Sequence, residues 1–241
     1  MNEKEAEVKL KVNGDYACFT RPEFKVERVS YPVMTPSAAR GIMEAIYWKP
    51  EIRYFIKEIW ILRQGTQTTI MRNEISSKQE RNPIVIEKDK ERQQRTGLIL
   101  KDVEYLIVAK MVLRPHTKHK IENYVPQFIR HRDKGQCFHQ PYLGNREFSA
   151  DFSKPNGKEQ CDPILRGNIV HLGQMLLDIA FIREEKREEN FLYFIPPEGD
   201  GLKAVKGYKQ ALFFNAKLEN GVLRVPQSKY RELVLMEGKD A

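Results

Sequence analysis

The chain has 241 residues, a formal net charge of +8 and a sequence pI near 9.3. That length allows one large domain or two small ones, with a hydrophobic core that needs no metal or disulfide. No apolar run is long enough to span a bilayer, and the acidic, polar N-terminus does not resemble a signal peptide. The positive charge favours a polyanionic partner over a membrane, although charge alone is weak support.

The number and spacing of the three cysteines indicate in which cellular compartment the protein works. Cys18, Cys137 and Cys161 are far apart and form no Cys-x-x-Cys pair. A disulfide framework and a Cys-rich zinc site are therefore both disfavoured. We expect a cytoplasmic protein with reduced thiols and no cofactor.

The N-terminal third predicts a strand followed by a helix. Val8, Leu10 and Val12 alternate with lysines, which is the period of a strand with one buried face. Thr35-Pro36 is a strong helix start, because Thr35 can cap backbone N–H groups and proline fits the first helical position. Apolar residues then recur at helical spacing as far as Ile46, and Pro50 ends the helix.

The middle of the chain completes a recognisable order of elements. Residues 52–62 and 103–113 are apolar and β-branched and predict strands, the second of them central. The polar stretch 63–98 between them is too long for an ordinary connection and predicts an extended hairpin or a partly mobile loop. A helix over 123–134, stopped by Gly135, and a strand over 146–152 follow. The order is that of an α+β, ferredoxin-like domain over residues 1–153.

The remainder predicts a small antiparallel β-rich domain over residues 154–241. Residues 191–195 form a short strand candidate. Residues 212–214 and 222–225 are apolar and flank Asn220-Gly221, the strongest short signal for a hairpin turn.

Four of the five histidines lie in one basic stretch, and two interpretations stay open for it. They are His116, His119, His131 and His139, interspersed with Lys and Arg. A phosphate-binding surface with a proton-transfer group is one interpretation. A solvated basic loop is the other, and composition alone favours it. A zinc site shared with Cys137 is disfavoured, because no spacing matches and neighbouring cations repel a metal ion.

Two aromatic residues at the end of the first helix fall outside its apolar repeat. Tyr47 and Trp48 can stack on a base or carry a hydroxyl into a site. Ordinary packing against the sheet is the alternative, and it is the default for Trp48.

Several segments, in order and spacing, resemble the Cas-five subunit of subtype I-C CRISPR systems, and together they cover nearly the whole chain. They are residues 14–23 (GDYACFTRPE), 29–31 (VSY), 38–42 (AARGI), 46–50 (IYWKP), 72–74 (RNE), 92–95 (RQQR), 135–139 (GQCFH), 143–148 (LGNREF) and 172–176 (LGQML).

The resemblance implies a RAMP-type protein with a ferredoxin-like, RRM-like N-terminal domain and a smaller β-rich C-terminal part. It implies an endoribonuclease that cuts precursor CRISPR RNA within the repeat, without metal, by attack of a 2′-OH. The implied partners are the precursor, the 5′ handle of the mature CRISPR RNA, and the backbone and large subunits of the Cascade complex.

The resemblance also implies site residues, with one departure. Tyr47 stands where the family has a catalytic tyrosine, but Asn123 and Tyr124 stand where an adjacent Lys-His pair is expected. The same dipeptide occurs earlier, as Lys118-His119. Three alternatives follow: Tyr47 acts with Lys118 and His119, Tyr124 with Lys120 replaces the pair, or the protein mainly binds RNA.

The implied RNA contacts are basic or aromatic, and ordinary surface charge is the alternative for each. They are Arg21, Lys25, Arg28, Arg40, Trp48, Lys49, Arg72, Arg92, Arg95, Arg130, Arg132, Lys134 and Arg146. A non-catalytic handle-binding subunit and an unrelated metalloenzyme built on the histidines are the competing functions.

Overall fold

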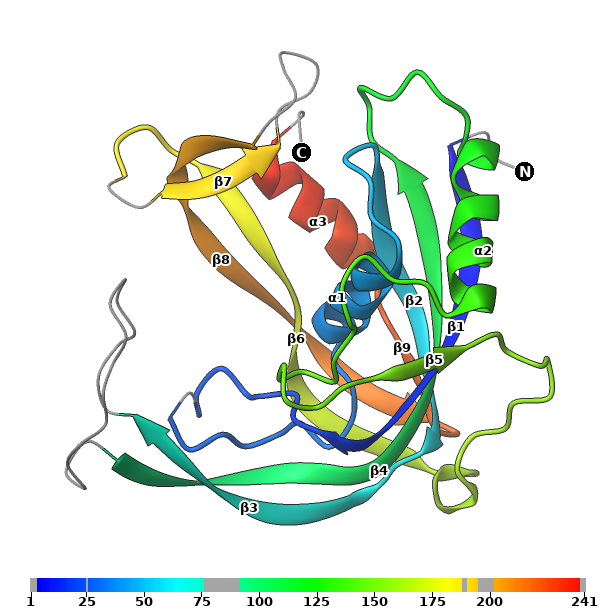
Figure 1. The fold of residues 1–241 in the computed structure, drawn as a ribbon, viewed down its shortest axis with the longest axis vertical. Helices are drawn as coiled ribbons and strands as arrows, with labels where there is room; N and C mark the ends of the chain where they lie inside the picture. The colour runs from blue at the N-terminus through cyan, green and yellow to red at the C-terminus, as the bar shows by residue number, and fades with distance from the viewer. Residues whose placement is uncertain (1–3, 25, 76–91, 188–189, 195–201, 239–241) are drawn as a thin grey trace.

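A computed structural model describes residues 4–24, 26–75, 92–187, 190–194 and 202–238. The fold is α+β, and its strands form an antiparallel sheet in the order β5-β1-β4-β2-β9-β8-β6 (Figure 1). Strand β3 adds to β4, and β7 adds to β8. Among the described residues, no helix is long and apolar enough to cross a membrane.

The first part of the chain builds the β5-β1-β4-β2 half of the sheet. Its elements are β1 (Glu5–Ala17), α1 (Pro36–Ile46), β2 (Ile52–Arg63), β4 (Arg92–Leu113), η2 (Ile121–Asn123), α2 (Val125–Lys134) and β5 (Asp151–Ser153). Strand β4 is central and antiparallel to both β1 and β2. Both helices lie on one face, because Tyr54 of β2 bonds the Tyr47 carbonyl beyond α1 and packs against Phe128 of α2.

The polar stretch between β2 and the end of β4 is an extended hairpin, as the sequence predicts. Strand β3 (Thr66–Ile75) pairs with the first part of β4, from Thr66 opposite Lys101 to Ile75 opposite Arg92. The two strands project from the body of the protein, at the bottom of Figure 1. Their described tips carry mostly exposed side chains, so the arm is held by backbone pairing more than by a core.

The second part of the chain continues the same sheet. It contains η3 (Pro163–Leu165), β6 (Ile169–Arg183), β7 (Asn190–Phe194), β8 (Leu202–Glu219), β9 (Val222–Arg224) and α3 (Gln227–Glu237). Strand β9 pairs with both β2 and β8 and so joins the halves. Helix α1 packs against β2 and β6, which lie on either side of that junction. The division into domains at residues 153 and 154 stays a prediction.

Local chemistry explains where the elements begin and end. The Thr35 hydroxyl accepts a hydrogen bond from the Ala38 N–H, 3.3 Å away, and caps α1. Gly135 ends α2 in the left-handed conformation. Asn220 and Gly221 both have positive φ, so they form the predicted hairpin turn between β8 and β9.

Two expectations need correction. The strand predicted over residues 146–152 is only Asp151–Ser153, because residues 143–148 form a turn closed by a bond from the Phe148 N–H to the Asn145 carbonyl. The C-terminal part is not purely β, since α3 packs against β6 and β2.

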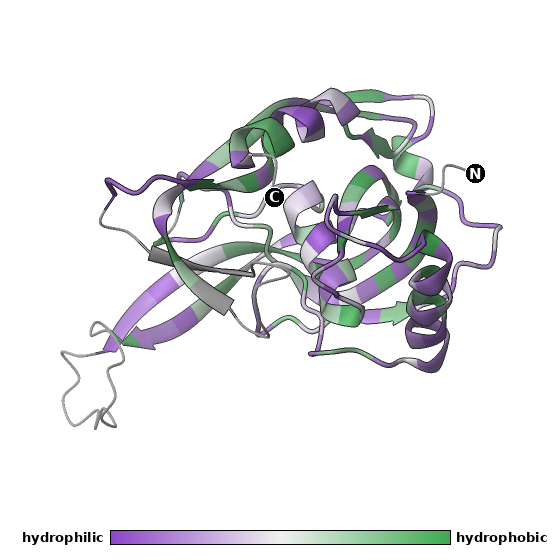
Figure 2. Cartoon of the chain, turned by 90° about the horizontal axis from the view of Figure 1, so that it is seen from above, coloured by the Kyte–Doolittle hydropathy of each residue, from purple (hydrophilic) through white to green (hydrophobic). Residues whose placement is uncertain are grey.

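Figure 2 shows why α2 lies at the surface: the helix is mostly hydrophilic, and Phe128 is its buried residue.

Candidate functional site

Tyr47 lies at the contact between α1 and α2. It ends α1, its side chain is 3% exposed, and its hydroxyl donates to the Gln127 Oε1 of α2 over 3.2 Å. Its ring meets the His131 ring edge to face, with centroids 5.3 Å apart. His131 Nδ1 in turn lies 3.0 Å from the Ile46 carbonyl oxygen. The α1–α2 seam, defined here by Ile46, Tyr47, Gln127 and His131, is therefore a hydrogen-bonded contact.

Glu51, which lies just before β2, binds the loop that follows β4. Its carbonyl accepts hydrogen bonds from the Arg114 N–H at 2.8 Å and from the Thr117 hydroxyl at 3.2 Å. The side chains nearby are poorly satisfied: Glu51 Oε2 and His116 Nε2 are buried without a hydrogen-bond partner in the described part of the chain. These two atoms therefore lack the hydrogen bond that a buried polar atom normally makes.

The electrostatics of this region keep Tyr47 and Tyr124 protonated. Burial, with smaller contributions from Tyr124 and Glu51, raises the pKa of Tyr47 to about 12, although Arg130 opposes the shift. Burial and Glu51 also raise the pKa of Tyr124. Burial and the positive charge of Arg114 lower the pKa of His116, with Glu51 opposing. At neutral pH the tyrosines are therefore hydrogen-bond donors, and His116 favours its neutral form.

The other predicted catalytic residues divide between the buried and the exposed side of this region. Tyr124 is buried at the start of α2 and interacts electrostatically with Tyr47. Lys118, His119 and Lys120 are exposed on the loop after β4. Thr117, just before them, donates a hydrogen bond to the Glu51 carbonyl. An exposed histidine and two lysines can exchange protons and neutralise a phosphate.

Sequence reasoning missed two residues of this region, Glu51 and Gln127. Glu51 directly follows residues 46–50, one of the segments that carry the family resemblance, and this proximity was the available signal. Gln127 gives no such signal, because it becomes relevant only when α2 packs on α1. Within the described residues, no group of three or more His, Cys, Asp or Glu is placed to hold a metal ion.

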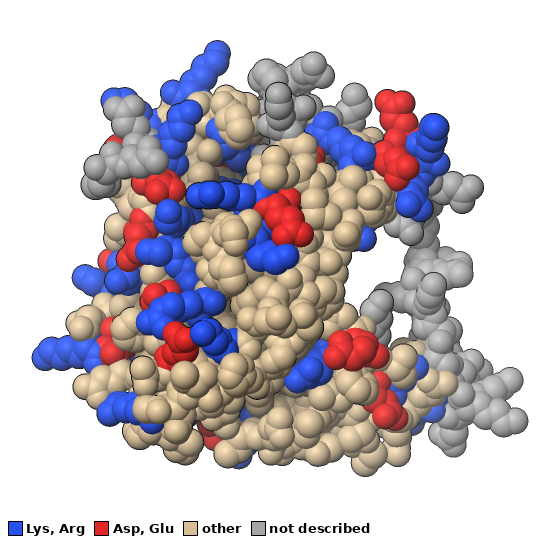
Figure 3. Space-filling view, turned by 180° about the vertical axis from the view of Figure 1, so that it is seen from behind, with Lys and Arg blue, Asp and Glu red and all other residues tan. Residues whose placement is uncertain are grey.

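Exposed cations follow α1 and line α2. Trp48 is 40% exposed, and Lys49, Arg130 and Lys134 are exposed beside it or along α2. Arg132 is less available, because its guanidinium bonds the Asp133 carboxylate and the Lys9 carbonyl. Seen from behind, Lys and Arg crowd the edge that carries α2 and β1, with Asp and Glu between them (Figure 3).

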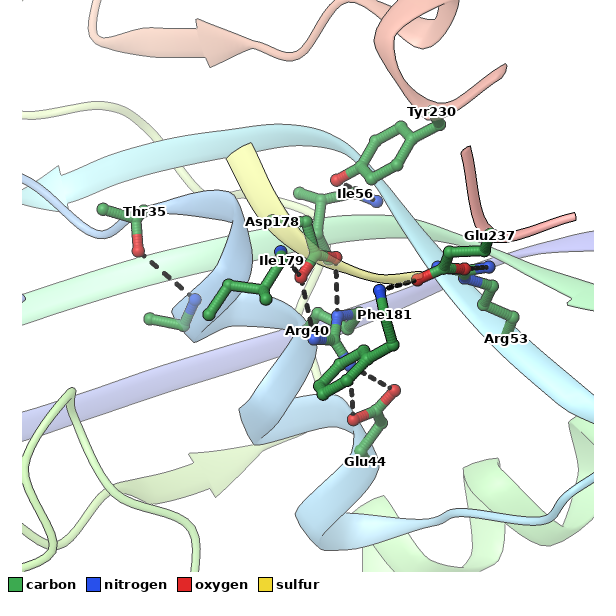
Figure 4. Close-up of polar contacts among 11 residues, drawn as sticks. Thr35, Arg40, Glu44, Arg53, Ile56, Asp178, Ile179, Phe181, Tyr230 and Glu237 are labelled. Carbon is green, nitrogen blue, oxygen red and sulfur yellow. Dashed lines mark hydrogen bonds and ion pairs between the residues drawn. The ribbon is translucent and has the colours of Figure 1, made fainter. Parts of the chain in front are cut away.

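Arg40 does not fit the expected role of an RNA contact. Its guanidinium forms a paired contact with Asp178 of β6, at 2.7 and 2.8 Å, and also bonds Glu44 (Figure 4). Asp178 is 1% exposed, so the pair is an interior link between α1 and the second part of the sheet. Two carboxylates occupy the guanidinium, and we therefore assign Arg40 to the fold and not to the nucleic-acid surface.

A second group of predicted contacts lies on the hairpin and the loops beside it. Arg72 pairs with Glu147 and with Glu74, and Arg95 pairs with Glu74 at 3.1 Å. Arg21 lies over the Tyr31 ring, 4.6 Å from its centroid. Arg28 is half-buried, Arg92 and Arg146 are exposed, and Lys25 lies outside the described residues. The predicted cations thus form two surfaces, one at the α1–α2 seam and one at the hairpin.

Comparison with known proteins places the chain in a family. Residues 7–226 match the family model described as CRISPR-associated protein (Cas_Cas5), in its Cas5d form. A relative from Thermus thermophilus named CRISPR pre-crRNA endoribonuclease Cas5d is 50% identical over 232 residues, 96% of each chain. A relative of the same name from Mannheimia succiniciproducens is 37% identical over 241 residues, 91% of this chain and 94% of that one.

Solved structures agree on the fold. An uncharacterized protein from Streptococcus mutans aligns with a TM-score of 0.61 at 20% identity, over 95% of this chain and 97% of that one. A second structure, of a CRISPR-associated protein, aligns with a TM-score of 0.61 at 19% identity, over 94% and 95%. The family match and the identities span nearly the whole length, and the chain belongs to the Cas5d family of CRISPR-associated proteins.

Proposed function

We propose that this protein is an endoribonuclease that cuts CRISPR precursor RNA within the repeat and then stays on the 5′ handle as a subunit of the type I-C Cascade complex. The observation that carries the proposal is a link through Glu51: it acts electrostatically on the protonated Tyr47, and its carbonyl accepts a hydrogen bond from Thr117, the residue before the exposed Lys118-His119-Lys120 stretch. The names of two relatives, at 50% and 37% identity, support the same substrate and reaction.

The proposed chemistry is a transesterification that needs no metal. His119 takes the proton of the attacking 2′-OH, the 2′-oxygen bonds to phosphorus, and the bond to the 5′-oxygen breaks. Lys118 and Lys120 offset the negative charge that builds on the phosphate oxygens. The leaving 5′-oxygen takes its proton from Tyr47 or Tyr124, each of which is held protonated. The products are a 2′,3′-cyclic phosphate and a 5′-hydroxyl.

The arrangement of β1, α1, β2, β4, α2 and β5 supports a ferredoxin-like domain as the frame of this site. In the βαββαβ order, β1, β2, β4 and β5 are the first, second, third and fourth strands. The sheet order β5-β1-β4-β2 therefore places the fourth strand beside the first, and the third between the first and the second. In that frame both helices share a face, so the end of α1 and the start of α2 can present one site. We infer a cytoplasmic protein that works with the backbone and large subunits of Cascade.

The burial of Tyr47 favours one alternative, a non-catalytic subunit that only binds the handle. The Tyr47 hydroxyl already bonds Gln127, and RNA must reach it by displacing that contact or by acting through the exposed loop. Incubation of the purified protein with repeat RNA separates the two functions. A single specific product that disappears in a Lys118→Ala/His119→Ala variant supports the enzyme, whereas tight binding with uncut RNA supports the alternative.

A further inference from the structure

Phe138 is a large apolar side chain held in solvent. It is 80% exposed, three residues after the glycine that ends α2. A single exposed apolar side chain is ordinary on a protein surface, so what distinguishes Phe138 is how its backbone is held and what surrounds it.

The backbone under Phe138 is fixed. The N–H groups of Phe138 and His139 both donate to the Ala45 carbonyl of α1, over 2.8 and 3.2 Å. The Gln136 N–H donates to the His131 carbonyl over 2.9 Å, and Gly135 turns the chain in the left-handed conformation. The His139 ring meets the Phe138 ring edge to face at 5.8 Å. The exposed ring is therefore presented from a firmly bonded turn.

That turn continues the α1–α2 seam. Gln127 bonds Tyr47, His131 approaches Ile46, and the turn after Gly135 bonds Ala45. Ala45, Ile46 and Tyr47 thus contact, in that order, the segment after α2, the second half of α2 and its first turn. Phe138 follows the end of α2 that is opposite Tyr124.

The surroundings of Phe138 favour a nucleic acid over a protein partner. The residues next to it in the chain, Lys134, Gln136, His139 and Gln140, are exposed and polar. A stable protein interface has an apolar core of several residues and buries well over 1,000 Å². Nucleic-acid sites instead combine single aromatic rings with cations that follow the phosphates.

We propose that Phe138 is a stacking platform for one unpaired base of the RNA beside the cut site, and so a positioning residue for the reaction. This inference rests on the proposed function. The base lies on the Phe138 face while Lys134 and Arg130 contact the neighbouring phosphates. The ring fixes the register of the strand along the seam without touching the reacting atoms.

The test uses the full chain and a repeat RNA with a 2′-deoxy group at the cut site, which binds without being cut. Affinity is measured at one salt concentration for wild type, Phe138→Ala and Phe138→Trp. Leu235→Ala is the matched control, because Leu235 is 81% exposed on α3. We expect Phe138→Ala to weaken binding about 5- to 150-fold, the range for loss of one base–aromatic stack, with Phe138→Trp and Leu235→Ala close to wild type.

The quenching of a fluorescent base gives a readout that would not change if Phe138 had only a structural role. 2-Aminopurine is placed at each unpaired position near the cut in turn, and its quenching is compared between variants. One position should be quenched by wild type and Phe138→Trp and released in Phe138→Ala. Wild-type affinity in Phe138→Ala overturns the inference. So does an equal loss of affinity in Phe138→Ala and Phe138→Trp with no 2-aminopurine position that loses its quenching. In either case, cleavage by the wild-type protein still supports the proposed function. Absence of RNA binding by wild type overturns both.

Discussion

The Tyr47 hydroxyl, at the end of α1, donates a hydrogen bond to the Gln127 Oε1 of α2 over 3.2 Å. Gln127 is exposed and also donates its Nε2 to the Asn123 carbonyl over 2.8 Å. One amide side chain thus connects the candidate catalytic tyrosine to the residue that stands in place of the expected lysine. Because this contact is to α2, a substitution of Tyr47 tests a different part of the site from a substitution in the Lys118-His119-Lys120 loop.

Replacing Tyr47 with Phe should separate chemistry from folding. The variant keeps the buried ring and loses one hydrogen bond, which costs about 1 kcal/mol of unfolding free energy. If the hydroxyl serves proton transfer or phosphate contact, the cleavage rate should fall about 100-fold or more. Single-turnover cleavage and urea denaturation measure the two effects.

Tyr16→Phe is the matched control for that variant. Tyr16 is a 40% exposed tyrosine on β1, so loss of its hydroxyl should change neither rate nor stability. A Tyr47→Phe protein that cleaves at the wild-type rate would show that the hydroxyl serves only the seam, and would leave the chemistry to Lys118, His119 and Lys120.

Alkaline pH should destabilise the fold through Tyr47. Its pKa is about 12 in the folded chain, against about 10 when unfolded. The unfolded chain therefore loses this proton first as pH rises. The stabilising effect is complete below pH 10 and is lost as pH increases from about 10 to 12. Urea midpoints at pH 8, 10 and 11 should fall in that order, and less steeply in Tyr47→Phe. An identical pH dependence in both proteins would contradict the shift.

Arg40 should matter for stability and not for RNA. Arg40→Met leaves the Asp178 carboxylate buried without its partner, and breaking such a pair typically costs 3–5 kcal/mol. Arg130→Met is the matched control on the exposed face of α2. It should change stability by less than about 0.5 kcal/mol and weaken RNA binding, lowering the salt dependence by about one charge. Weak RNA binding by folded Arg40→Met would restore Arg40 as a contact.

The hairpin should serve assembly. Met71 and Thr96 are directly paired, so residues 72–95 can be replaced by an Asn-Gly turn without breaking the ladder below them. The shortened protein loses the Arg72–Glu147 ion pair and should keep nearly its full unfolding free energy. Its incorporation into Cascade, followed by co-purification with the other subunits, should fall sharply. Normal incorporation would show that the arm contacts neither RNA nor a neighbouring subunit.

Local signals predicted much of the fold. Thr35-Pro36, Gly135 and Asn220-Gly221 each fix the backbone through their own chemistry, and the structure confirms all three. The strand over 146–152 was wrong in extent, because its apolar residues pack in a turn. Helix α3 was missed because its apolar residues 233–236 are consecutive and not spaced along one face, and Leu235 is exposed, so no strong helical stripe marks it.

The site was less predictable because its members meet only through tertiary packing. Tyr47 was found from its segment, but the contact to Gln127 depends on how α2 packs against α1. The ion pair of Arg40 could not be predicted, because its partner Asp178 lies 138 residues away in the chain. Charge and motif identify candidate cations, and only the fold shows which of them a carboxylate already occupies.

Cleavage of the repeat RNA in excess EDTA tests the central claim most directly. The purified protein is incubated with an all-ribose RNA and with one that carries a single 2′-deoxy group at the mapped cut site. We predict one cut in the all-ribose RNA, a 2′,3′-cyclic phosphate on the upstream product, and no cut in the deoxy RNA. Cutting that stops in EDTA, or that continues at the deoxy position, would contradict metal-independent attack by the 2′-OH.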